Sequence, residues 1–231
     1  MTLNLAVGRC VLGLALTAPL ARATPAQETR LLVGAGPAYG RATGALGRYM
    51  GGAWGAGGFV AFGPAERTAR IRIDADFVRF APTTDARPYR AGQPVFITSG
   101  SQLFAAIAGP EVRLPLGRVR VSAAAGAGFV TSTNTGAVTG IGTADRFSGA
   151  TAFSDLTLAY AGGGGLGLDL GGARTPVWLD LSARYLGTGP TRWVREGNIP
   201  VGYISGAYLK PTRSPTTLVV YRLAASVGIP R

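Results

Sequence analysis

Apolar and polar side chains alternate along much of this chain. In residues 68–77, TARIRIDADF, one side of an extended chain carries the charges Arg70, Arg72, Asp74 and Asp76. The opposite side carries Ile71, Ile73, Ala75 and Phe77. A period of two residues is that of a β-strand with two different faces. The same alternation runs through 177–185 and 219–229, and no segment has a helical period.

This alternation predicts eight extended segments, at 31–41, 52–63, 68–80, 102–115, 118–130, 154–171, 175–187 and 216–229. The connections alternate in length. Those at 64–67, 116–117 and 172–174 are short, whereas those at 42–51, 81–101, 131–153 and 188–215 are long. Tight turns at one end and long loops at the other are typical of outer-membrane barrels. The predicted fold class is therefore all-β, an eight-stranded antiparallel up-and-down transmembrane β-barrel with both ends periplasmic.

The polar faces carry small residues, which favours an enclosed interior over a solvated surface. In 154–171 this face holds Thr157, Ala159, Ala161, Gly163, Gly165, Gly167 and Asp169. Eight strands enclose only enough room for side chains, and small residues leave space for long arginines. A soluble sandwich with solvated charges is the alternative interpretation.

The inward charges nearly balance, as an enclosed interior requires, because a buried charge without a partner is costly. The predicted lumen ion network consists of Arg70, Arg72, Arg113, Arg120, Arg184 and Arg222 with Asp74, Asp76, Glu111, Asp169 and Asp180. From their depth along the strands, Asp180 is expected to pair with Arg222. Arg120 is expected to pair with Asp169 or Glu111.

The first residues have the pattern of an export signal. Arg9 precedes the apolar run 10–21, which is too short to span a bilayer, and ARA at 21–23 is a small-x-small cleavage site. Cleavage after Ala23 or after Ala26 fits. We expect residues 1–23 to be a signal peptide and 24–231 to be one barrel domain. Removal of the signal peptide takes away Cys10, the only cysteine in the sequence.

In this architecture the chain resembles the small eight-stranded outer-membrane barrels of the OmpA/OmpX type. The resemblance covers about 30–229 and rests on the signal peptide, ARIRIDADF, VWLDLSARY, the loop alternation and the last strand TLVVYRLAASVGI. It implies a bacterial outer-membrane location, and it concerns only the membrane part of OmpA-like proteins, because no peptidoglycan-binding domain is expected in this sequence. Barrels of this type commonly end in Phe, whereas this chain ends GIPR.

The sequence lacks the residues of common catalytic and metal sites. Histidine is absent, which excludes Ser-His and Cys-His catalysis, and zinc sites need cysteine or histidine. The glycines of GGGGLG, 162–167, lie within a predicted strand without a following helix, so they indicate packing rather than nucleotide binding. Asp74 and Asp76 lie among arginines, which favours salt bridges over catalysis. We therefore expect a protein that is not an enzyme and has no catalytic residues, cofactor or metal.

Positive charge gathers in the last long loop. The loop contains one acidic residue, Glu196, and four basic ones, Arg192, Arg195, Lys210 and Arg213. The expected partners are outer-membrane lipids and lipopolysaccharide phosphates, not nucleic acid, and the chain is expected to be a monomer. Two functions remain open. One is a closed structural or surface-interaction barrel acting through its outer loops. The other is a small-ligand binding or transport barrel with a cavity lined by Gly34, Gly36, Ala38, Ala124, Gly126, Gly163 and Gly165.

Overall fold

The structure is a computed structural model that describes residues 29–48, 50–64, 68–88, 94–140, 148–171, 176–193 and 212–229. The predicted signal peptide lies outside these residues. Within them no helix is long and apolar enough to cross a membrane.

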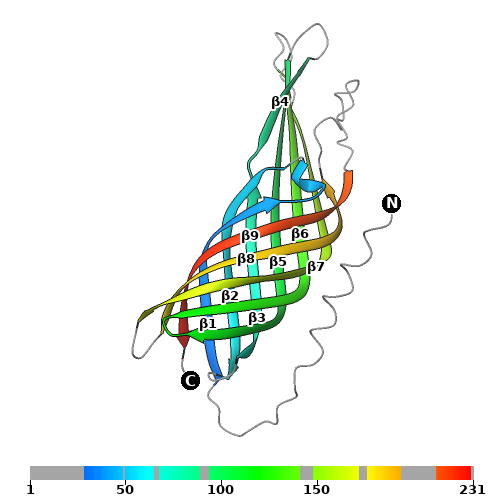
Figure 1. Cartoon of the computed structure of the whole chain (residues 1–231). Coiled ribbons are helices and arrows are strands. Elements are labelled where there is room, and N and C mark those ends of the chain that lie inside the picture. The colour runs from blue at the N-terminus through cyan, green and yellow to red at the C-terminus, as the bar shows by residue number, and fades with distance from the viewer. Residues whose placement is uncertain are drawn as a thin grey trace, which may run out of the picture.

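The described strands form one antiparallel sheet that closes on itself (Figure 1). The wall consists of β1 (Thr29–Ala42), β2 (Gly52–Pro64), β3 (Ala69–Phe80), β5 (Pro94–Leu116), β6 (Val119–Gly140), β7 (Ser148–Gly171), β8 (Val177–Trp193) and β9 (Thr212–Ile229). Each strand pairs with the next, and the ring closes where β1 pairs with β9. A short strand, β4 (Thr83–Pro88), pairs with the start of β5 above the ring. The predicted eight-stranded up-and-down barrel is confirmed.

The wall is higher on one side than the sequence predicts. β5, β6 and β7 continue through 94–101, 131–140 and 148–153, which the sequence places in loops, and β8 continues through 188–193. Together with β4, the strands β5, β6 and β7 rise well above β1 and β2 at the outer end (Figure 1). These stretches are rich in Thr, Ser and Gly, residue types found in turns. Threonine also favours strands, and here pairing with a long neighbour decides the outcome.

The outside of the wall is apolar. On β3 exposure alternates strictly from Ile71 onward, and the side chains of Ile71 and Ile73 are 46% and 44% exposed. Large apolar side chains are exposed on every strand of the ring. So much exposed apolar surface around a closed wall requires hydrocarbon rather than water as its solvent. The protein is an outer-membrane β-barrel, and the isoleucines of the charged strand face lipid.

A glycine shapes the tight turn between β5 and β6. Gly117 has a φ of 68°, in the left-handed region that residues with a Cβ rarely adopt. The two-residue connection therefore depends on glycine at this position.

Candidate functional site: the charged lumen

The periplasmic half of the lumen holds a cluster of ion pairs around Asp74 and Asp76 of β3. Arg222 of β9 places Nη2 2.7 Å from Asp74 Oδ1 and Nη1 3.2 Å from Asp76 Oδ1. Arg184 of β8 places Nη1 2.7 Å from Asp74 Oδ2, and its Nη2 binds Asp76. Arg72 binds Asp74 from the same strand at 2.9 Å. The cluster links β3 across the barrel to β8 and β9, neither of which is a neighbour of β3 in the ring.

Glu111 of β5 extends this cluster towards the periplasmic end. Its side chain is 0% exposed, and its two oxygens lie 2.6 Å from Arg72 Nη1 and 2.7 Å from Arg113 Nε. The second contact is an ion pair without the alignment of a hydrogen bond. Arg70 lies opposite Glu111 in the register of β3 and β5 and is half-buried. Arg72 thus joins Glu111 to Asp74 in one network.

A separate group lies where β6, β8 and β9 approach one another. Arg120 Nη2 lies 2.7 Å from both oxygens of Asp180 and also donates to Ser226 Oγ at 3.1 Å. The Ser226 hydroxyl in turn donates to Asp180 Oδ2. The guanidinium of Arg120 lies over the Trp178 ring, 4.2 Å from its centroid. Alternation alone gives no sign of the roles of Ser226 and Trp178.

The predicted partners of Arg120, Asp180 and Arg222 were wrong. Asp180 and Arg222 are on neighbouring strands but do not pair. Arg222 reaches across the lumen to β3, and Asp180 pairs with Arg120 instead. Depth along each strand is a poor guide here, because an arginine side chain spans much of a narrow lumen.

Asp169 does not join the network either. Its Oδ1 accepts a hydrogen bond from the Gly171 amide at 2.8 Å, and its backbone oxygen accepts one from Arg118. Asp169 lies in the last residues of β7, beside the periplasmic turn. A short carboxylate at that position bonds to the backbone two residues ahead.

Glycines make room for the large inward side chains. A Cβ on Gly57 would collide with Asp76 Oδ1, and one on Gly167 would collide with Arg120 Nε. A Cβ on Gly34 would meet the Phe59 ring, which packs under Arg72 with 3.9 Å from guanidinium to ring centroid. The spaces beside these three glycines are therefore already filled by side chains.

The outer part of the lumen holds an apolar cluster among buried, uncharged Ser, Thr and Asn side chains. Val78 and Phe80 of β3, Leu103 of β5 and Leu218 of β9 are buried in one cluster. Leu46, from the short 3-10 helix Leu46–Arg48 between β1 and β2, is buried in the same cluster. Trp193, which the sequence places in a loop, is buried at the end of β8 with its ring edge-on to Phe80.

The lumen contains a small cavity beside Arg72, Asp74 and Arg184. Its volume is about 10 Å³, and Gly126 and Ala161 also line it. That is at most the space of one water molecule. No group of three or more potential metal ligands occurs among the described residues.

Of the four positive residues expected in the last outer loop, the structure describes Arg192 and Arg213. Arg195 and Lys210 lie outside the described residues. Arg192 pairs with Asp155, with Nη2 2.7 Å from Oδ1, and its backbone amide donates to Asp155 Oδ2. Arg213 is exposed opposite Arg192. The hydrogen bonds that the side chain and backbone of Arg192 donate to Asp155 lower the pKa of that carboxyl group.

Comparison with known proteins supplies fold neighbours and no family. No family model and no curated protein matches the sequence. Among solved structures it is similar to Ail, the attachment invasion locus protein of Yersinia pestis, with 14% identity over 87% of this chain and 99% of that one, at a TM-score of 0.49. It is also similar to a major outer membrane protein from Thermus thermophilus, with 14% identity over 87% of this chain and 98% of that one, at a TM-score of 0.44. Neisserial surface protein A is similar with 16% identity over 86% of this chain and 96% of that one, at a TM-score of 0.39.

These likenesses are too loose to carry a function. The assignment of this chain to the outer-membrane barrels depends instead on its closed antiparallel ring, its apolar outside and its filled lumen. The chain has the fold of the small eight-stranded outer-membrane barrels and lies in the bacterial outer membrane.

Proposed function

We propose that this protein is a closed, non-enzymatic barrel that acts as a structural or surface-interaction protein of the outer membrane. The observation that supports a closed barrel most directly is the cluster around Asp74 and Asp76, to which Arg184 and Arg222 reach from the far side of the lumen. The apolar cluster that includes Leu103 and Leu218 fills the lumen above it. Two different layers therefore obstruct the same path. The filled space beside Gly34 and the small volume of the cavity beside Gly126 speak against the transport alternative.

Single-channel recording in planar bilayers tests the closed barrel. Purified, refolded protein should give no stable conductance steps in concentrated potassium chloride, while a porin of about 16 strands in the same bilayer gives large ones. A gel that separates folded from heated protein shows that the barrel added was folded. Stable porin-sized steps from the folded monomer would reject the closed barrel in favour of transport.

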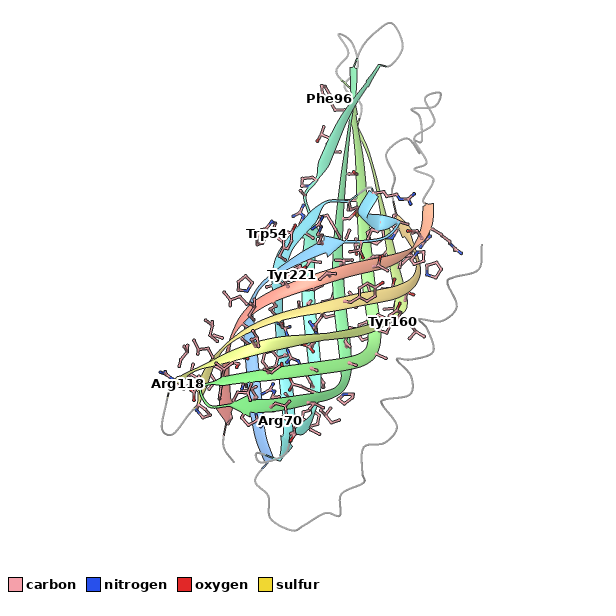
Figure 2. All side chains as sticks on the ribbon, in the orientation of Figure 1. Trp54, Arg70, Phe96, Arg118, Tyr160 and Tyr221 are labelled. Carbon is pink, nitrogen blue, oxygen red and sulfur yellow. The ribbon has the colours of Figure 1, made fainter. Side chains whose placement is uncertain are left out.

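The surface-interaction part of the proposal requires the high wall of β4 to β7 to stand outside the cell. Thr84→Cys on β4 and Arg118→Cys in the turn between β5 and β6 place thiols at opposite ends of the barrel; Figure 2 shows Arg118 at the end away from β4. A membrane-impermeant maleimide added to intact cells should label the first variant and not the second. Labelling of the Arg118 variant alone would invert the orientation.

A further inference from the structure

Two arginines point out of the wall rather than into the lumen. Arg79 of β3 and Arg41 of β1 are both exposed, on the same side of their strands as Ile73 and Val33 respectively. Neither forms an ion pair with any described residue. All other charges on β3 point inward, where each is paired or half-buried. An arginine on the lipid-facing side is tolerated only near the membrane interface, so the level of these residues matters.

Both arginines lie near the outer edge of the apolar band. Arg79 follows Ala69, at the periplasmic start of β3, by ten residues. At roughly 3.3 Å per residue and a tilt of roughly 40°, the rise along the barrel axis is about 25 Å, which is the height of an outer-membrane barrel's apolar band. The guanidinium of Arg79 is therefore level with the outer-leaflet headgroups.

An aromatic row runs along the wall beside these arginines. In register, Tyr221 of β9 is opposite Tyr39 of β1, Tyr39 is opposite Trp54 of β2, and Trp54 is opposite Arg79. The Tyr39 and Trp54 ring centroids are 4.8 Å apart, and those of Tyr39 and Tyr221 are 6.4 Å apart. Trp54 is 69% exposed. Figure 2 shows Trp54 and Tyr221 on the same outer part of the wall.

Arg41 adds the second charge one step further out. Its register partner on β2 is Gly52, and the Tyr39 hydroxyl occupies the space that a side chain at Gly52 would fill. Tyr39 thus bends towards the level of Arg41. Arg41 and Arg79 are separated by one intervening strand and are offset by two residues in register, so their backbones lie about 12 Å apart.

We propose that this surface binds the phosphates of a phosphorylated glycolipid in the outer leaflet. Arg41 and Arg79 would each bind a phosphate by charge-assisted hydrogen bonds, because guanidinium matches phosphate geometry and neither group has a counter-ion among the described residues. The aromatic row would pack against the sugar and the first part of the acyl chains, as amphipathic rings do at membrane interfaces. A lipid with phosphates at both ends of a disaccharide suits two arginines on one face. This site differs from the last outer loop that the sequence indicated.

The inference deepens the surface-interaction function and takes its outer orientation from it. Its test is independent of conductance, so failure of one does not imply failure of the other.

The test uses the folded, full-length mature barrel in detergent and diphosphorylated lipid A as the probe. Native mass spectrometry measures the fraction of barrels that retain one lipid across a titration. The double variant Arg41→Gln with Arg79→Gln should bind about tenfold more weakly, a loss expected when two charge-assisted hydrogen-bonding groups are removed. Arg118→Gln removes the same charge at the periplasmic turn and should change the affinity less than about twofold.

Three further arms separate lipid recognition from general attraction of anions. Monophosphorylated lipid A should bind the unmodified barrel more weakly than the diphosphorylated lipid. Inorganic phosphate in millimolar excess should not displace the lipid. Arg41→Lys with Arg79→Lys should retain more affinity than the glutamine pair, because lysine keeps the charge and loses the fork. Equal binding by the barrel and its glutamine variant, equal loss in Arg118→Gln, or full displacement by inorganic phosphate would each overturn the proposal.

Discussion

The two halves of the lumen are built from the same strands but from different chemistry. β3 sends Arg72, Asp74 and Asp76 into the periplasmic half and Val78 and Phe80 into the outer half. The inner side of the wall is therefore not a polar side. It is an enclosed core whose composition changes with depth. The charged half links strands that face each other across the lumen. The outer half is filled by apolar side chains with uncharged polar ones between them.

The two halves should respond differently to substitution. Removing one member of a buried ion pair leaves an uncompensated charge, whatever the size of the replacement. In an apolar core the cost follows the volume that is lost, and swaps that conserve volume are tolerated. The following measurements, from the largest expected effect to the smallest, can break or sharpen this contrast.

Arg222→Met should lower the free energy of unfolding by about 3–5 kcal/mol. Arg222 is 2% exposed and binds both Asp74 and Asp76, so its loss leaves both carboxylates undercompensated. Methionine retains most of the length of the side chain, which separates charge from volume. Equilibrium urea unfolding from lipid bilayers measures the change. A loss below about 1 kcal/mol would show that the charged half tolerates neutral replacements as an apolar core does.

Leu103→Ala should lower the free energy of unfolding by about 2–5 kcal/mol, since it leaves a cavity in the outer half. Leu103 is 1% exposed. Its matched control, Leu103→Met, should cost less than about 1.5 kcal/mol. The same urea titrations measure both variants. If methionine costs as much as alanine, volume does not govern the outer half.

Arg120 and Asp180 should show an interaction energy of about 0.5–3 kcal/mol in a double-mutant cycle. The variants are Arg120→Gln, Asp180→Asn and their combination, and unfolding free energies are measured for all of them. The comparison cycle combines Asp180→Asn with Arg222→Gln, a pair that the structure keeps apart, and its interaction energy should be smaller. A larger value in the comparison cycle would favour the pairing expected from depth.

Asp155→Asn should cost less than about 1 kcal/mol, because this pair with Arg192 is partly exposed at the outer rim. The pKa of Asp155 is lowered in the folded state, so its contribution is present well above the ordinary value of 3.8 and is lost as pH falls below it. Unfolding free energies of the variant and the parent protein should therefore converge below pH 3.8. A gap that widens at low pH would contradict the sign of this effect.

The sequence predicted the strands and their faces well, because a period of two residues is a local signal. Ile71 and Arg72 could be assigned to opposite sides without knowing the fold. The pairing of Arg222 with Asp74 could not, because their separation of 148 residues is bridged only by the closed ring. The strand extension through 131–140 was missed for a different reason. Its threonines and glycines suit a turn as well as a strand, and pairing with β5 decides the outcome.

The outward arginines show the same limit. Arg79 continues the alternation of β3, but alternation does not give height in the membrane. Its level becomes visible only when the start of the strand and the register with Trp54 are known.

Closure of the ring between β1 and β9 has a consequence for the order of assembly. Leu31 pairs with Ile229, so the seam joins the first and last strands of the described chain. Such a contact of high sequence separation is slow to form, because nearly the whole chain must be organised before its loop-closure entropy is repaid. Arg222 is carried on β9, and with it the link to Asp74 and Asp76. Until β9 docks, these two carboxylates lack one partner, so the charge network becomes complete only when the seam closes.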